Sequence, residues 1–137
     1  MKNSRRKFME RAAALAATIG LTSWPFSVSA NQRNSTMLVH QVYFWLKNPQ
    51  NELDHAKLLK GLQTLLTIES IDSGHIGIPA ATEARDVVDH SSAFSYNVRF
   101  KSIADHNSYQ TGPVHLKFIE ECQGLWSEVK VYDHNLV

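Results

Sequence analysis

Apolar and polar residues alternate most regularly in two segments of the chain, residues 37–46 and 94–100. In the first segment, one set of alternate positions holds Leu38, His40, Val42, Phe44 and Leu46, and the other holds Val39, Gln41, Tyr43 and Trp45. In the second segment, aromatic and apolar residues occupy every second position: Phe94, Tyr96, Val98 and Phe100. Because successive side chains of a strand point to opposite faces, both segments are predicted to be strands.

Between and after these strands, apolar residues recur at helical spacing. Five leucines between residues 58 and 66 predict an amphipathic helix that starts at Asn48-Pro49 or at Asn51 with Asp54 and runs to about Ile68. A capping pattern at 102–105 begins a short helix that reaches Tyr109 or Gln110. After Thr111-Gly112, Pro113 is suited to the first position of another helix, which ends near Gly124. Two weaker strands are predicted at residues 71–78, which contain two glycines, and at residues 128–134.

The predicted elements follow the order β-α-β-β-α-β. This order is typical of the α+β class and predicts a ferredoxin-like fold with a four-stranded antiparallel sheet. The helices cover one sheet face. The other face carries Val39, Tyr43 and Trp45, which a single chain leaves in water. Such a patch predicts a partner, and a symmetric homodimer is the simplest one.

The charge of the chain is divided between two unlike parts. Its formal net charge is +1, but residues 1–30 carry five basic residues against one acidic residue, and the remainder carries nine against twelve. The basic part contains Arg5-Arg6 before an alanine-rich stretch and ends in Val28-Ser29-Ala30. A charged start, an apolar centre and small residues at the end predict a signal peptide of the twin-arginine type over residues 1–30.

This reading divides the chain into a signal peptide, a flexible leader at residues 31–36 and a domain at residues 37–137. It predicts a periplasmic or secreted protein without stable membrane association once the signal is cleaved after Ala30. An uncleaved anchor is the alternative, but roughly 13 apolar-leaning residues are fewer than the ~20 that span a bilayer. The acidic domain has no basic stripe, which argues against a nucleic-acid partner.

Common chemical motifs are absent from the sequence. It contains no glycine-rich nucleotide loop, zinc-protease motif or paired CxxC, and Cys122 is its single cysteine. The seven histidines match no common ligand spacing, so neither a metal nor a cofactor is predicted. Five of these histidines lie in polar or loop-like contexts and are expected at the surface: His55, His75, His90, His106 and His134.

His40 and His115 differ because each lies on an apolar face. One interpretation is that both are core histidines with local hydrogen-bond partners. The other is that both line a cavity between the sheet and the helices. In that case His115, in the first helical turn after Pro113, stays neutral because the helix dipole disfavours imidazolium, and it can take a proton. Tyr109 can then turn its hydroxyl toward the same space and polarise a carbonyl group.

Four segments together resemble the stress-responsive A/B barrel (Dabb) family: residues 38–44, 95–102, 109–115 and 130–133. The most specific is Tyr109 followed by His115, with Pro113 two residues before the histidine. The resemblance covers residues 37–134 and implies a dimeric α/β barrel, in which the sheets of two ferredoxin-like subunits pack face to face.

The resemblance also implies roles for particular residues. One plant member of the family closes a polyketide ring by aldol condensation, and the catalytic tyrosine and histidine of that member fall on Tyr109 and His115. His40 matches a further pocket histidine, whereas Phe94 stands where that member has another. Three functions follow as hypotheses: an exported homodimer that binds a small molecule in a pocket that includes His40 and Phe94, an enzyme that uses Tyr109 and His115 for proton transfer on a carbonyl compound, or a metal-binding or structural stress protein.

Overall fold

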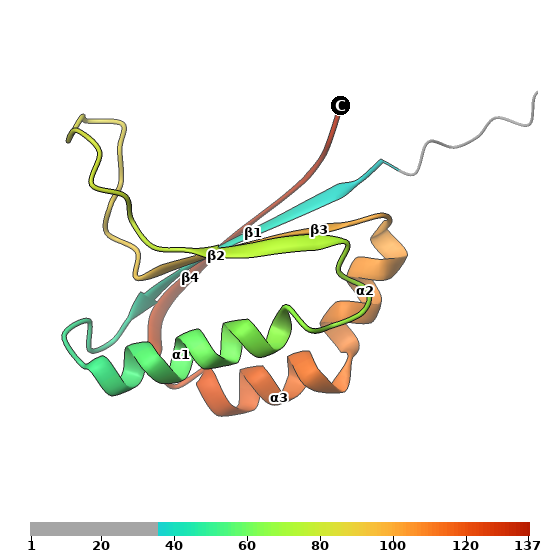
Figure 1. Cartoon of the computed structure of the whole chain (residues 1–137), viewed down its shortest axis with the longest axis horizontal. Coiled ribbons are helices and arrows are strands. Elements are labelled where there is room, and N and C mark those ends of the chain that lie inside the picture. The colour runs from blue at the N-terminus through green and yellow to red at the C-terminus, as the bar shows by residue number, and fades with distance from the viewer. Residues whose placement is uncertain (1–35) are drawn as a thin grey trace, which may run out of the picture. The chain divides into compact units, whose positions relative to one another are not determined.

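A computed structural model of the chain describes residues 36–137, so the predicted signal peptide and nearly all of the leader lie outside the described residues. The elements follow the predicted order, with two consecutive helices in the second helical region (Figure 1). They are β1 (Leu38–Leu46), α1 (Glu52–Leu65), β2 (Ser73–Gly77), β3 (Phe94–Phe100), α2 (Ile103–Thr111), α3 (Pro113–Cys122) and β4 (Trp126–Asn135). Within residues 36–137, no helix is both long and apolar enough to span a bilayer.

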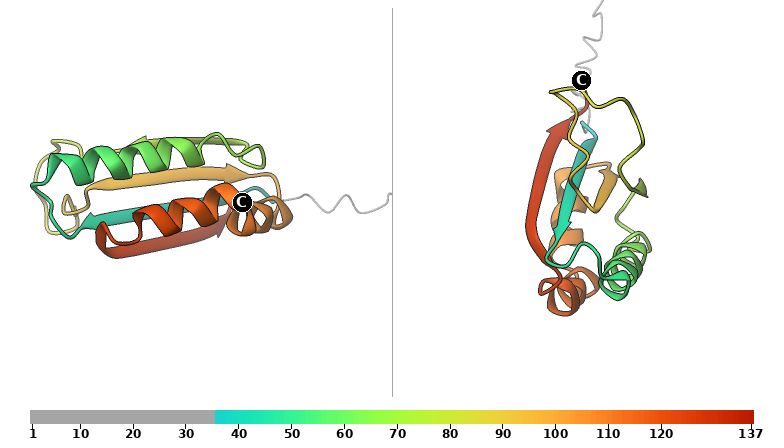
Figure 2. Two further views of the ribbon diagram at one scale, coloured as in Figure 1. Left: turned by 90° about the horizontal axis from the view of Figure 1, so that it is seen from below. Right: turned by 90° about the vertical axis from the view of Figure 1, so that its left-hand side faces the viewer.

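The four strands form one antiparallel sheet in the order β2-β3-β1-β4, which places β1 and β3 at its centre. All three helices lie on the same face of this sheet (Figures 1 and 2). The predicted α+β, ferredoxin-like fold with a four-stranded antiparallel sheet is therefore confirmed. At the centre of the sheet, His40 on β1 lies opposite Val98 of β3 on one side and Asp133 of β4 on the other.

The helices begin at capping residues that the sequence predicted. The Asn51 side chain accepts hydrogen bonds from the backbone N–H groups of Leu53 and Asp54, and the Ser102 hydroxyl accepts one from Asp105. Pro113 begins α3. The last strand is longer than predicted because it pairs along the whole length of β1, although its own alternation of apolar and polar residues is weak.

The core lies between the helices and the inner face of the sheet, the face that the helices cover. Its fully buried side chains come from β3 and from the apolar stripes of the helices, and they include Leu58, Leu62, Leu65, Val98, Phe100, Tyr96 and Tyr109. Cys122 is a buried free thiol in this core. Burial of this apolar surface is the main stabilising contribution to the fold.

The outer face of the sheet carries no helix. The alternate residues of β1 reach it together with their partners on β3 and β4, so Tyr43 lies between Ser95 and Lys130. One expectation for this face is wrong: Val39 is only 8% exposed in the single chain. Tyr43 and Trp45 are half-buried, and Trp45 donates a hydrogen bond from Nε1 to Ser91 in the segment between β2 and β3.

Candidate functional site

Four rings meet under the inner face of the sheet, at the end where α2 and α3 join. We call His40, His106, Tyr109 and His115 the ring cluster. The ring centroid of Tyr109 lies 5.9 Å from that of His40 and 4.8 Å from that of His115, and the centroids of His40 and His106 are 5.1 Å apart. The structure thus brings three predicted site residues, His40, Tyr109 and His115, into one cluster.

His40 is the most buried histidine of the cluster and is oriented by an aspartate. It is 3% exposed, and its Nδ1 lies 2.6 Å from Oδ1 of Asp133, its partner across the β1–β4 ladder. Burial lowers the pKa of His40, which the hydrogen bond to Asp133 only partly offsets. A neutral His40 that donates from Nδ1 to Asp133 keeps its proton on Nδ1 and leaves Nε2 as an acceptor.

Tyr109 lies at the centre of the cluster and is the buried residue that α2 contributes to the core. Burial raises the pKa of its hydroxyl to about 12, so this group remains a hydrogen-bond donor at neutral pH. Tyr96 of β3 is also buried, and burial together with Tyr109 raises its pKa further. The two hydroxyls lie close enough to affect each other's pKa, but the Tyr96 hydroxyl has no hydrogen bond of good geometry within the described part of the chain.

His115 lies in the first turn of α3, as the sequence predicted. Its Nδ1 is buried and makes no hydrogen bond of good geometry among residues 36–137, although the backbone of Gln110 lies near the ring. The pKa of His115 is lowered, first by burial and then by the nearby His40, while the backbone of Gln110 offsets part of this effect. An imidazole that is neutral and has an unpaired buried nitrogen is available to a small polar molecule.

His106 was expected at the surface, and that expectation is wrong. Its ring is half-buried, with its centroid 5.2 Å from that of Phe100 and 5.1 Å from that of His40. The Gln110 amide nitrogen lies 3.3 Å from His106 Nε2. His106 and Tyr109 are three residues apart on one helix and so share a face, which is a signal that the sequence did contain. Of the other four histidines expected at the surface, His75 and His134 are exposed, whereas His55 and His90 are half-buried, so the expectation is wrong for these two as well.

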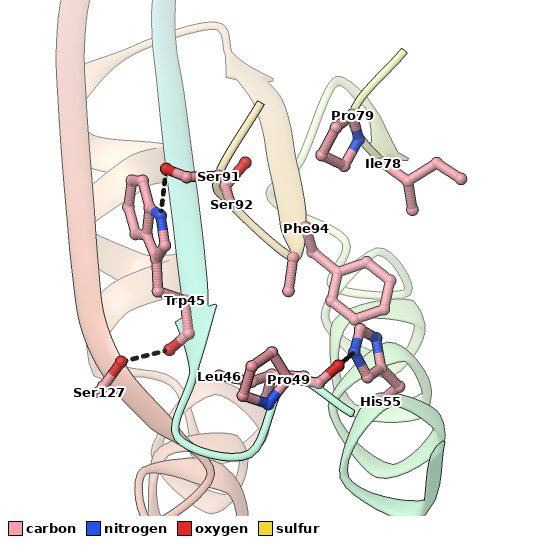
Figure 3. Close-up of a pocket in the computed structure, with 11 residues that line it drawn as sticks. Trp45, Leu46, Pro49, His55, Ile78, Pro79, Ser91, Ser92, Phe94 and Ser127 are labelled. Carbon is pink, nitrogen blue, oxygen red and sulfur yellow. Dashed lines mark hydrogen bonds between the residues drawn. The ribbon is translucent and has the colours of Figure 1, made fainter. Parts of the chain in front are cut away.

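Phe94 lies at the other end of the sheet, away from the ring cluster. It pairs with Phe44, four residues along β1 from His40, or roughly 13 Å at the rise of a strand. There it lines a pocket of about 530 Å³ together with Trp45, Pro49 and His55 (Figure 3). This pocket contains none of the ring-cluster residues. His40 and Phe94 therefore do not line one pocket in this structure.

The ring cluster offers more polar chemistry than the pocket at Phe94. In the pocket, His55 Nε2 lies 2.9 Å from the carbonyl oxygen of Pro49, and Trp45 Nε1 donates to Ser91, so these polar groups already have partners. Because a polar group that already has a hydrogen-bond partner gains little stabilisation from a ligand, the pocket offers a ligand mainly apolar contacts. The ring cluster has neutral imidazoles, a hydroxyl donor and an unpaired nitrogen.

The model of one protein family, the stress responsive A/B barrel domain (Dabb), matches residues 38–136. The chain belongs to this family. The resemblance drawn from its sequence segments is confirmed, and the ring cluster is thus a feature of a Dabb domain. No curated protein matches the chain in sequence.

Solved structures share the fold of this Dabb domain at low sequence identity. A Dabb family protein with a ferredoxin-like fold from Mesorhizobium loti is 18% identical, with a TM-score of 0.61 over 74% of this chain and 98% of that one. Hydroxynitrile lyase from Passiflora edulis is 17% identical, with a TM-score of 0.64 over 75% and 95%. A dimeric ferredoxin-like protein from Thermobifida fusca is 12% identical, with a TM-score of 0.60 over 74% and 92%. At such identities the likeness shows the fold alone.

The lowered pKa of His115 predicts a pH-dependent stability. In the unfolded chain this histidine binds a proton as the pH falls through about 6.5, whereas in the folded chain it remains neutral to lower pH. Its contribution is therefore fully present above pH 6.5 and is lost as the pH falls toward the folded pKa, by at most about 1.4 kcal/mol per pH unit.

Urea unfolding between about pH 7 and 5 measures this effect when the wild type is compared with His115→Gln. The wild type should lose stability more steeply on acidification than the variant, which has no imidazole at this position. Equal pH slopes for the two proteins would show that His115 titrates normally in the folded state.

Proposed function

We propose that this Dabb protein is an exported homodimer that binds a small polar molecule at the ring cluster. The observation that carries the binding proposal is the buried Nδ1 of His115, which makes no hydrogen bond of good geometry and whose ring lies against Tyr109. A ligand that accepts a hydrogen bond from the Tyr109 hydroxyl and bonds to His115 would satisfy both groups. A carbonyl compound with an adjacent hydroxyl or acidic C–H has this combination of groups.

Dimerisation is proposed through the outer face of the sheet. This face has no helix over it, and its aromatic side chains are partly open to water. Tyr43 and Tyr132 pack edge to face with ring centroids 6.1 Å apart, and Trp45 lies under the ammonium group of Lys130. Two hollows of about 420 and 470 Å³ adjoin Tyr43. A second copy packed face to face would cover these aromatic rings. The name of the Thermobifida fusca structure describes that protein as dimeric.

Proton transfer on a carbonyl compound is the second candidate function. It is supported by the contact between Tyr109 and His115 and by the directions of their pKa shifts. The raised pKa keeps the proton on the Tyr109 hydroxyl, whereas the lowered pKa keeps the His115 imidazole neutral and able to accept a proton. In such a step the imidazole of His115 takes a proton from the substrate, and the Tyr109 hydroxyl donates a hydrogen bond to the carbonyl oxygen as negative charge develops there. The similar Passiflora edulis protein is named a hydroxynitrile lyase.

Binding at the cluster is tested by thermal shift with a panel of small aldehydes, ketones and hydroxy ketones. A ligand at 100 times its Kd stabilises the wild type by about 2.7 kcal/mol. The variant Tyr109→Phe with His115→Ala should lose this response, because it keeps the central ring but lacks the hydroxyl and the imidazole. The matched control is His90→Ala, since His90 lies in the segment between β2 and β3, outside the ring cluster. Equal responses in all three proteins would contradict the proposal.

The two candidate functions are separated by hydrogen–deuterium exchange at the acidic C–H of any compound that binds. If the wild type catalyses this exchange and the Tyr109→Phe, His115→Ala variant does not, the protein performs proton transfer. If the compound binds but exchanges at the rate seen in buffer, the binding function alone stands.

Export is proposed from the N-terminal sequence alone. In a bacterial host with a twin-arginine route, the mature protein should begin at Asn31 when the intact mass is measured. Replacing Arg5 and Arg6 with lysine should keep the uncut precursor in the cytoplasm, and a paired replacement of Lys2 and Lys7 with arginine is the control. Equal export of both variants would contradict the twin-arginine route.

A further inference from the structure

Three potential metal ligands that are distant in sequence lie together at one side of the ring cluster. One ring nitrogen each of His40 and His106 and one carboxylate oxygen of Asp133 all lie within 4.8 Å of one another. The residues come from β1, α2 and β4, so the sheet register and the position of α2 bring them together. We propose that His40, His106 and Asp133 form a binding site for a divalent transition-metal ion such as Zn²⁺.

The donor set fits this class of ion. Two imidazoles and one carboxylate suit zinc, cobalt, nickel or iron better than magnesium or calcium, which prefer oxygen ligands alone. Bonds of about 2.0–2.1 Å in a tetrahedral arrangement place the ligand atoms roughly 3.3 Å apart. The most widely separated ligand atoms must therefore approach each other by at most about 1.5 Å, and the 2.6 Å contact between His40 and Asp133 must open by less than about 1 Å.

The ion would take the place of a proton. The hydrogen bond between His40 and Asp133 holds a proton on Nδ1. If Nδ1 is the ligand atom, this proton leaves for solvent as the nitrogen lone pair and the carboxylate oxygen bind the metal. Asp133 is partly open to solvent, its side chain being 44% exposed, which gives the ion an entry path and leaves room for water or a small molecule at the remaining positions.

The two histidines of the site are also more buried than a pair of histidines on the surface would be. His40 is almost fully buried, and Phe100 packs against both imidazoles, with ring centroids 6.4 Å from His40 and 5.2 Å from His106. Such packing limits the rotation of both rings and so reduces the entropy lost when they bind an ion. His115 and Tyr109 are not needed as ligands, so this inference does not rest on the proposed function.

The test uses untagged, chelator-treated protein and two probe ions. Co²⁺ should produce visible absorption of the d–d type, and Zn²⁺ competition with a chromophoric chelator should give one ion per chain. His106→Ala and Asp133→Asn should each weaken Zn²⁺ binding by at least about 10-fold. Asp133→Asn can retain a hydrogen bond to His40 Nδ1, so its effect does not depend on a change in fold.

The matched control is His90→Ala, which removes a half-buried histidine between β2 and β3, at the opposite end of the sheet from α2. It should bind both ions like the wild type. In imidazole NMR spectra, Zn²⁺ should shift the signals of His40 and His106 and leave those of His90 in place. Equal affinity in wild type, His106→Ala and Asp133→Asn, or binding that His90→Ala abolishes, would overturn the proposal.

Discussion

Phe100→Ala is expected to lower the free energy of unfolding by about 3–5 kcal/mol, the cost of removing a large aromatic ring from a packed core. Phe100 is 0% exposed, and its ring packs against three members of the ring cluster at once: His40, His106 and Tyr109. Since small domains are stable by only about 5–15 kcal/mol, this variant should lose a large share of its free energy of unfolding.

Urea denaturation at one fixed protein concentration measures the difference, because the stability of a dimer depends on concentration. Ile103→Ala is the control: it also removes an apolar side chain, three residues further along, but that side chain is 59% exposed. Its effect should stay within about 0.5 kcal/mol. A loss below about 1 kcal/mol in Phe100→Ala would show that the rings around this site do not form a packed core.

Tyr43→Glu is expected to weaken dimerisation by about 100-fold or more. Tyr43 lies on the central strand of the outer face, between Ser95 and Lys130. In a two-fold symmetric interface each substitution occurs twice. The interface therefore loses two aromatic rings and must take two carboxylates out of water, a cost that the neighbouring Lys130 only partly offsets and that amounts to at least about 3 kcal/mol in total. Sedimentation equilibrium should show a dimer for the wild type and a monomer for the variant at micromolar concentration.

Leu116→Glu provides the matched control, since it places the same charge at an exposed apolar position of α3, on the helical side of the domain. This variant should remain dimeric. A monomeric wild type, or a Tyr43→Glu protein that is dimeric with unchanged affinity, would contradict dimerisation through the sheet face.

The two predictions concern opposite faces of one sheet, with Phe100 on β3 and Tyr43 on β1, and β1 contributes side chains to both faces. His40 points to the helices and Tyr43 points away from them, because side chains alternate along a strand. The same strand therefore holds a candidate ligand-binding group in the core and a candidate contact for a second copy. A variant of Tyr43 should change the oligomeric state without moving the imidazoles, whereas a variant of Phe100 should disturb the ring cluster directly.

Much of the fold could be predicted because its signals are local. The alternation along residues 94–100, the leucine spacing before residue 66 and the caps at Asn51 and Ser102 each involve residues only a few positions apart. The predicted bounds of β4, residues 128–134, were too short at both ends, because the extent of this strand depends on pairing with β1 rather than on its own residues. The placement of His40 and His115 on apolar faces was likewise read from local spacing, and both lie on the inner side of the sheet.

The order of the elements, the faces of β1 and β3, and the position of His115 in the first turn of a helix could all be predicted, because each follows from the periodicity of neighbouring residues. Three further facts come from the folded chain alone: Asp133 orients His40, His106 joins Tyr109 under the sheet, and Phe94 lies at the other end of the sheet. These facts depend on strand register and helix docking, which are set by packing between segments far apart in the chain. The spacing of residues along a single sequence does not reveal such contacts directly.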